Sequence, residues 1–210
     1  MKTPFRYQAT DSDCVPTTFI NALQFLFERE EIPQDVLQKV MSYSLNTVNN
    51  KGEIGKDGTT GYAIEAILEF IRSYRKDGFA CECEYLEGGQ VHLRQGNKLM
   101  KCINNGGVVL LAVCTDNTDY ATHVILALGQ DLSRNSLLFF DPFFRKRKFY
   151  GECPDTIEWL GFGFVDEATE RPIGQNPNLR VSYERLNSYD CLRYSMGPKH
   201  VRECYLLWRL

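Results

Sequence analysis

The first half of the chain carries apolar residues at helical spacing. After a polar start, they recur at intervals of one, three and four residues, at Phe19, Ile20, Leu23, Leu26 and Phe27. This is the stripe of an amphipathic helix with one buried face. By this pattern we expect helices over about residues 14–30, 33–43, 60–76 and 95–104. The stretch 44–60 is rich in Asn, Gly and Asp, which is typical of a loop.

From residue 107 the pattern changes to apolar runs of strand length. The runs "GVVLLAVC", "ATHVILALG" and "SLLFFDPFF" are separated by the turns "TDNTDY" and "QDLSRN". We expect three consecutive antiparallel strands, at about 107–114, 121–129 and 136–140. The segments "LRVSYERL" and "HVRECYLLWRL" are also predicted to be strands.

Helices that lead and strands that follow indicate an α+β fold. We expect a single domain over 1–210, in which a helical half of about 1–106 packs on a β-rich half of about 107–210. A chain of 210 residues is long enough to bury a substantial core.

Composition narrows the class of protein. The chain is 43% hydrophobic and 24% charged, with a net charge of −3, which argues against nucleic-acid and membrane-surface binding. No run of 18 apolar residues predicts a membrane span, and the start "MKTPFRYQAT" lacks the apolar core of a signal peptide. We therefore expect a cytoplasmic protein, in which most of the eight cysteines are free thiols.

Cys14 lies at the predicted start of the first helix. Ser12 and Asp13 are favourable N-cap residues, and Pro16 suits a first helical turn. Free backbone N–H groups and the positive end of the helix dipole favour a thiolate at this position. The alternative interpretation is a small, buried apolar side chain.

A thiol nucleophile needs a base, and the chain has three histidines. His123 begins the middle predicted strand, whereas His92 has no evident orienting partner and His200 lies near the C-terminus. If 130–135 forms the hairpin loop, His123 faces about residue 142, one step from Asp141. A carboxylate there would fix the tautomer of the imidazole and stabilise the imidazolium. A backbone-satisfied histidine and a strand-ending Asp-Pro turn are the alternatives.

Gln8 lies six residues before Cys14. Acyl transfer by a thiolate develops an oxyanion, for which the backbone N–H of Cys14 and a side-chain amide of Gln8 are candidate donors. By itself, a glutamine is typical of a solvated surface position.

Together these residues resemble a known family. Gln8, "DCVPT" at 13–17, "THVILALG" at 122–129 and "FFDP" at 139–142 are similar to motifs of the bacteriocin-processing (double-glycine leader) peptidases and their stand-alone relatives. These are papain-like cysteine peptidases. The resemblance implies that Cys14 is the nucleophile, His123 the base, Asp141 its orienting group and Gln8 part of the oxyanion hole.

Two departures from the family pattern stand out. Val15 occupies a position where the family usually has glycine, which would narrow the pocket beside the nucleophile. No membrane or ATP-binding region accompanies the motifs, although the best-known members are domains of exporters. This second departure puts the leader-peptide substrate in question more than the chemistry.

The functional hypothesis is a cysteine peptidase that acts on a peptide or protein substrate and needs no cofactor or metal. The same site would also suit a related acyl transfer, such as deamidation or a transglutaminase-like reaction. A non-catalytic binding module on the same fold is the third hypothesis. The sequence does not specify the oligomeric state.

Two further patterns have their own alternatives. Cys81 and Cys83, with His200 and Cys204, are a candidate zinc site, but alternation with Glu82 and Glu84 favours a buried strand face instead. The run "RKRK" at 145–148 is typical of a solvated rim, with binding of an acidic partner as the alternative.

Overall fold

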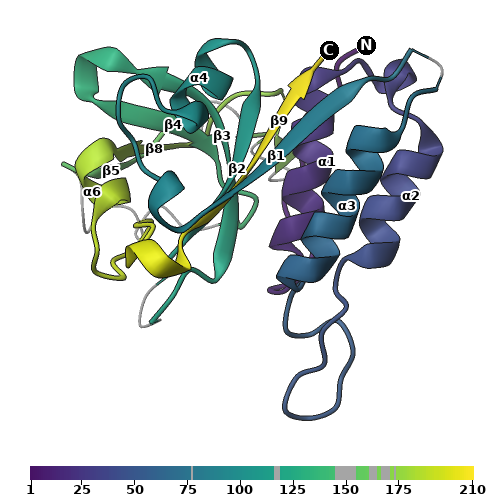
Figure 1. Cartoon of the computed structure of the whole chain (residues 1–210), viewed down its shortest axis with the longest axis horizontal. Helices are drawn as coiled ribbons and strands as arrows, with labels where there is room; N and C mark the ends of the chain where they lie inside the picture. Colours follow the sequence, from purple (N-terminus) through teal and green to yellow (C-terminus); the bar gives the residue numbers. More distant parts are fainter. Residues whose placement is uncertain (77, 116–118, 145–154, 161–164, 167–170, 173) are drawn as a thin grey trace.

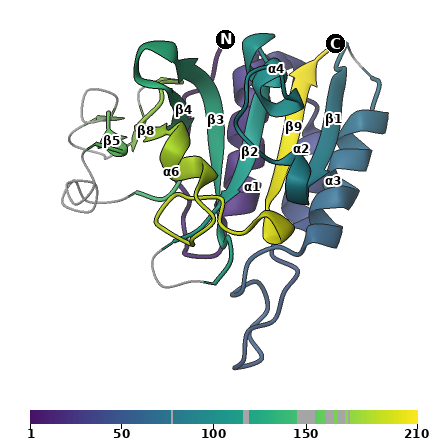
Figure 2. The same ribbon diagram turned by 60° about the vertical axis from the view of Figure 1, so that its left-hand side comes forward.

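In the computed structural model of the protein, one antiparallel sheet separates two groups of helices (Figures 1 and 2). The structure describes residues 1–76, 78–115, 119–144, 155–160, 165–166, 171–172 and 174–210. On one face lie α1 (Cys14–Leu26), α2 (Gln34–Tyr43) and α3 (Gly61–Ser73), and on the other lie α4 (Lys98–Asn104) and α6 (Tyr183–Asn187). The α+β prediction is thus confirmed.

The sheet has the strand order β1-β9-β2-β3-β4-β8-β5. Its strands are β1 (Cys81–Glu87), β2 (Val108–Val113), β3 (His123–Asp131), β4 (Ser136–Phe140), β5 (Ile157–Trp159), β8 (Leu179–Ser182) and β9 (Glu203–Arg209). A separate pair is formed by β6 (Val165–Asp166) and β7 (Arg171–Pro172). The three predicted consecutive strands are β2, β3 and β4, and each pairs with the next.

Several expected elements differ from the structure. The first helix ends at Leu26, and a short 3-10 turn (Arg29–Glu31) follows it. The segment "LRVSYERL" is not one strand, because it divides into β8 and α6: the Ser182 hydroxyl accepts a hydrogen bond from the Arg185 N–H and caps the helix. The segment from His200 likewise begins in a 3-10 turn (Lys199–Val201) before β9.

The core has two layers because the central strands are buried on both faces. Every residue of β2 is buried, which explains its unbroken apolar run. Leu110 and Leu126 pack toward α1 and α3, whereas Leu111 and Ile125 pack toward α4. β1 comes from the half predicted to be helical, and it pairs with β9 along its length.

Contacts of α1 fix the start of that helix beside the sheet. The buried Thr18 hydroxyl donates to the Val124 carbonyl of β3 at 3.0 Å. The Asn21 side chain bonds both backbone groups of Arg6, so the N-terminal segment lies along the helix. The Gln8 N–H then donates to the Pro142 carbonyl at 2.8 Å, just beyond β4. The starts of α1 and β3 and the end of β4 therefore meet.

Most of the cysteines that the structure describes are free thiols, as expected, and one pair is joined. Cys114 and Cys191 form a disulfide, with a Cα–Cα separation of 5.3 Å. Among the described residues, the remaining thiols are free, at Cys14, Cys81, Cys83, Cys102 and Cys204. None of the described helices is long and apolar enough to cross a membrane. The "RKRK" run lies outside the described residues.

Candidate active site

Cys14 is the first residue of α1, and its side chain is almost entirely buried. Asp13 occupies the N-cap position, but its carboxylate makes no capping bond to the helix. It accepts instead from the backbone N–H groups of Ala9 and Thr10, at 2.9 and 2.8 Å. Asp13 therefore orders the turn that leads into the helix, and the thiol sits where the helix dipole favours negative charge.

His123 and Asp141 are in direct contact. The imidazole Nε2 lies 2.7 Å from the carboxylate Oδ1, and both side chains are buried. The hairpin register explains the approach: Leu126 faces Phe140, and a bulge between Ala127 and Gly129 shifts the pairing nearer the turn. The hairpin argument made from the sequence thus identified two residues that the structure brings together.

Electrostatics couple His123 to the thiol. Burial alone would raise the pKa of Cys14, but the hydrogen bond and charge of His123, with backbone N–H groups of Val124 and Val15, lower it below its ordinary value. Burial would likewise lower the pKa of His123, but the charge and hydrogen bond of Asp141, helped by Cys14, raise it to about 9. Both shifts favour the charged pair, a thiolate beside an imidazolium, over the neutral thiol and imidazole.

Asp141 is held by more groups than the sequence indicated. Its carboxylate accepts from the Phe143 N–H at 2.9 Å and from the Tyr194 hydroxyl. The Asn178 side chain bonds both the N–H and the carbonyl of Asp141, at 2.8 and 2.9 Å. Sequence reasoning missed Tyr194 and Asn178, because neither lies in a periodic segment or a recognisable motif. The nearest signal is that Asn178 directly precedes the strand segment "LRVS".

Gln8 lies next to the strand end that carries Asp141, through its backbone bond to Pro142. Its side-chain amide donates to the Thr10 carbonyl at 2.7 Å, and it does not line the cavity that contains Cys14. The amide oxygen is buried and has no hydrogen-bond partner among the described residues. An amide nitrogen carries two hydrogens, so the Thr10 carbonyl takes only one of them.

Cys14 and His123 line a cavity of about 450 Å³. Val15 lines it as well, where the resembled family usually has glycine. Part of the wall comes from 56–59, in the loop that projects between α2 and α3 (Figure 1). The Thr47 hydroxyl donates to the Gly58 carbonyl across the base of that loop. The cavity therefore lies directly beside Cys14 and His123.

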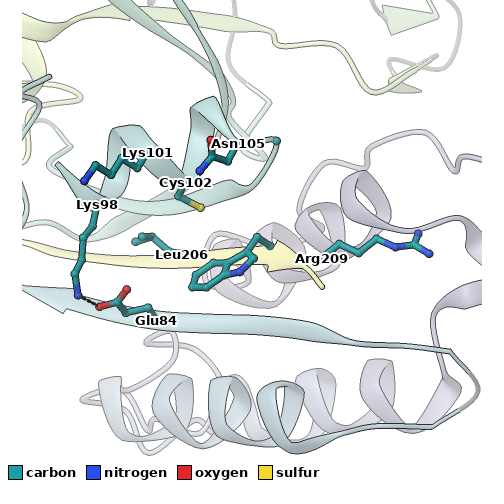
Figure 3. A pocket seen from close by; sticks show the side chains of 9 residues that line it. Glu84, Lys98, Lys101, Cys102, Asn105, Leu206 and Arg209 are labelled. Carbon is teal, nitrogen blue, oxygen red and sulfur yellow. Dashed lines mark hydrogen bonds and ion pairs between the residues drawn. The ribbon is translucent and has the colours of Figure 1, made fainter. Parts of the chain in front are cut away.

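A second cavity, of about 410 Å³, lies between α4 and β9 (Figure 3). It contains the thiol of Cys102, whose pKa burial raises to about 12. On its rim, Lys98 forms an ion pair with Glu84 (Figure 3). No histidine lines this cavity, so no imidazole is available beside the Cys102 thiol to stabilise a thiolate.

The candidate zinc ligands do not gather into a metal site. Cys81 and Cys83 are buried on β1, as the alternation predicted, whereas His200 is exposed. Among the described residues, no group of three or more His, Cys, Asp or Glu side chains is arranged to hold a metal ion.

Comparisons of the chain with protein-family models, with curated proteins and with solved structures found no match. Its chemistry must therefore be judged from the site itself. That site combines a buried thiol of lowered pKa, an imidazole of raised pKa and a buried carboxylate, next to an accessible cavity.

Proposed function

We propose that the protein is a papain-like cysteine peptidase that cleaves a peptide or protein substrate through Cys14, His123 and Asp141. The observation that carries the proposal is the imidazole of His123, which contacts the Asp141 carboxylate through Nε2 and also interacts with the Cys14 thiol. The motif resemblance supports the same roles. A nucleophile from a helix start and a base from an antiparallel sheet also fit the papain-like arrangement.

The reaction follows from these groups. The Cys14 thiolate attacks the substrate carbonyl, and the resulting oxyanion needs donors, for which the Cys14 N–H and the second amide hydrogen of Gln8 are the candidates. The His123 imidazolium then gives its proton to the leaving amine, and a thioester remains. His123, now neutral, takes a proton from water, which attacks the thioester and releases the acid and the thiolate.

The two shifted pKa values define a pH window for this reaction. At low pH the Cys14 thiolate is protonated and the thiolate–imidazolium pair is lost. Because the pKa of Cys14 is lowered, this loss occurs at a lower pH than for an ordinary thiol. The pair is also lost as the pH rises through about 9, where His123 gives up the proton needed by the leaving amine. Activity should therefore appear at a pH below the ordinary pKa of a cysteine thiol and decline above about pH 9.

The first experiment maps a peptide-like, thiol-directed electrophile on the native protein by mass spectrometry. We expect the adduct on Cys14, in preference to the buried thiols of Cys81, Cys83, Cys102 and Cys204. His123→Ala should suppress this adduct, whereas His200→Ala, which changes an exposed histidine, should not. Uniform labelling of the thiols, or labelling that ignores His123, would contradict the proposed site.

The second experiment identifies the reaction from its products on a peptide mixture. New amino termini that are absent with Cys14→Ala would support a peptidase. Ammonia release with conversion of glutamine to glutamate would instead identify a deamidase, and peptide cross-links a transglutaminase-like reaction. Peptide binding without turnover would favour the non-catalytic binding module.

A further inference from the structure

The backbone at Tyr194 is in an unusual conformation. Its φ angle is 61°, in the left-handed region that few residues other than glycine adopt, and its side chain is buried. A bulky residue persists there only when its surroundings enforce the conformation, and such positions concentrate at functional sites.

The surrounding loop is fastened to the end of β2. The Cys114–Cys191 disulfide joins the loop to the residue that follows this strand. The Cys114 N–H donates to the Ser195 carbonyl at 2.7 Å, and the Tyr194 N–H donates to the Cys114 carbonyl at 2.9 Å. Gly197 packs so closely on the disulfide that a Cβ there would lie 2.9 Å from the Cys191 sulfur. These contacts leave Tyr194 little freedom to relax.

We propose that Tyr194 is a positioning residue, whose hydroxyl holds the Asp141 carboxylate in the orientation that His123 requires. The inference rests on the proposed function, because it concerns the same Cys14–His123–Asp141 site. Tyr194 touches neither the thiol nor a substrate in this role, and it acts through Asp141 alone.

The two carboxylate oxygens of Asp141 accept hydrogen bonds from different groups. Oδ1 of Asp141 accepts from His123 and from the Phe143 N–H, whereas Oδ2 accepts from the Tyr194 hydroxyl. Asn178 fixes the backbone of Asp141 but does not touch its carboxylate. The carboxylate is fully buried, so water cannot replace a missing donor. Without the Tyr194 hydroxyl, Oδ2 would lose this donor, and the carboxylate would be held less firmly in the orientation that places Oδ1 against His123.

A weaker His123–Asp141 contact would change the pKa values of both His123 and Cys14. The imidazolium loses part of its counter-charge, so the pKa of His123 falls from its raised value. The thiolate in turn loses part of the imidazolium that stabilises it, so the pKa of Cys14 rises. The two pKa values therefore move toward each other, and the thiolate forms only at higher pH.

The test compares Tyr194→Phe with the matched control Tyr183→Phe. Tyr183 also donates its hydroxyl to a side chain, Gln130, but on β3 and away from the carboxylate. The first measurement is the rate of Cys14 alkylation by iodoacetamide as a function of pH. Because hydrogen bonds to charged groups are among the strong ones, we expect Tyr194→Phe to slow alkylation about 10-fold below neutral pH and to move the acid limb upward. Tyr183→Phe should leave the profile unchanged.

A second comparison, made in the Asp141→Ala variant, separates a positioning role of Tyr194 from a general structural effect. In Asp141→Ala the Tyr194 hydroxyl has no carboxylate to orient, so adding Tyr194→Phe should slow alkylation no further. The inference would be overturned if the pH profile of alkylation in Tyr194→Phe were unchanged or if its acid limb moved downward. It would also be overturned if Tyr194→Phe slowed alkylation equally in the Asp141→Ala background.

The measurements also distinguish this inference from the proposed function. The imidazole titration of His123, followed by NMR, needs neither a substrate nor a reactive thiol. A lower midpoint in Tyr194→Phe than in the unaltered protein would support the positioning role even if no peptide were cleaved. An identical midpoint would reject that role even if peptidase activity were established.

Discussion

Cys14 and Cys102 are both buried thiols on helices, and the two helices pack on opposite faces of the same sheet. Each lines a cavity of similar volume, about 450 Å³ and about 410 Å³. The pKa of Cys14 nevertheless lies below its ordinary value, whereas burial raises that of Cys102 to about 12. Burial in a cavity wall therefore does not by itself decide the direction in which the pKa of a thiol is shifted.

The difference lies in what each thiol touches. Cys14 is the first residue of its helix and interacts with the His123 imidazole. Cys102 lies within α4, and its thiol donates to the carbonyls of Val108 and Leu207. One region supplies a cation and backbone N–H groups, and the other supplies backbone oxygens. We interpret the first as a reaction site and the second as a packing site.

The largest test of this comparison removes each thiol in turn. Cys14→Ala should lower turnover by about 10⁵–10⁶-fold, because removing the nucleophile of such a unit removes the whole of its covalent chemistry. Cys102→Ala should leave turnover within a few-fold and cost about 1 kcal/mol of stability. The measurements are peptide turnover and denaturant unfolding. Comparable loss of turnover in both variants would erase the distinction between the two regions.

Asp141→Asn tests what sustains the cation beside Cys14. The amide keeps the shape of the carboxylate but loses its charge and presents the wrong hydrogen-bond partner to His123, so turnover should fall by about 10³–10⁴-fold. The pH dependence of Cys14 alkylation should move upward, toward that of an ordinary thiol. Asp131→Asn is a suitable control, because Asp131 pairs with Arg180 away from the site. Equal turnover in Asp141→Asn and the unaltered protein would mean that Asp141 has no part in the reaction.

The positions of Cys14, His123 and Asp141 were easier to predict from the sequence than the residues that hold them in place. Cys14 follows capping residues and precedes an apolar stripe, and the hairpin spacing brings His123 near Asp141. These are local signals, and the structure contains the helix start, the hairpin and the His123–Asp141 contact they predicted. The helical spacing also predicted α1, α2, α3 and α4, which the structure contains.

The remaining features depend on contacts between distant parts of the chain. Tyr194 reaches Asp141 from an irregular loop 53 residues away, and no periodicity marks such a contact. Cysteine pairing cannot be deduced from a sequence, so the Cys114–Cys191 bond was missed. β1 (residues 81–87) pairs with β9 (residues 203–209), which is distant in the sequence, and neither segment carries a signal that identifies the other as its partner. The helical turn after Ser182 is too short for its apolar pattern to be read.

Gln8→Ala tests how far the reaction site extends beyond the three central residues. If the amide supplies one of two oxyanion donors, turnover should fall by about 10²-fold, with Cys14 alkylation unchanged. Alkylation should be unchanged because the oxyanion forms only when the thiolate attacks the carbonyl of a substrate, and iodoacetamide reacts without forming one. Gln24→Ala offers a control at another glutamine, whose buried amide oxygen has no hydrogen-bond partner in the described part of the chain. Unchanged turnover in Gln8→Ala would restrict Gln8 to its bond with the Thr10 carbonyl.

The smallest effect is expected at the packing site, and it should appear in stability alone. Gly107 lies against Cys102: a Cβ at this position would be 2.6 Å from the Cys102 sulfur and 2.9 Å from the Leu207 carbonyl oxygen. Real Cβ contacts are not this short, so Gly107→Ala must displace α4 or β9, at a cost of about 1–3 kcal/mol. Gly89→Ala is the matched control, because nothing lies within 4 Å of its added Cβ and the backbone there is not left-handed. Denaturant unfolding should therefore distinguish the two alanine variants, while Cys14 alkylation stays the same in both. A change in Cys14 reactivity in Gly107→Ala would show that the two faces of the sheet are coupled, and the contrast between a reaction site and a separate packing site would fail.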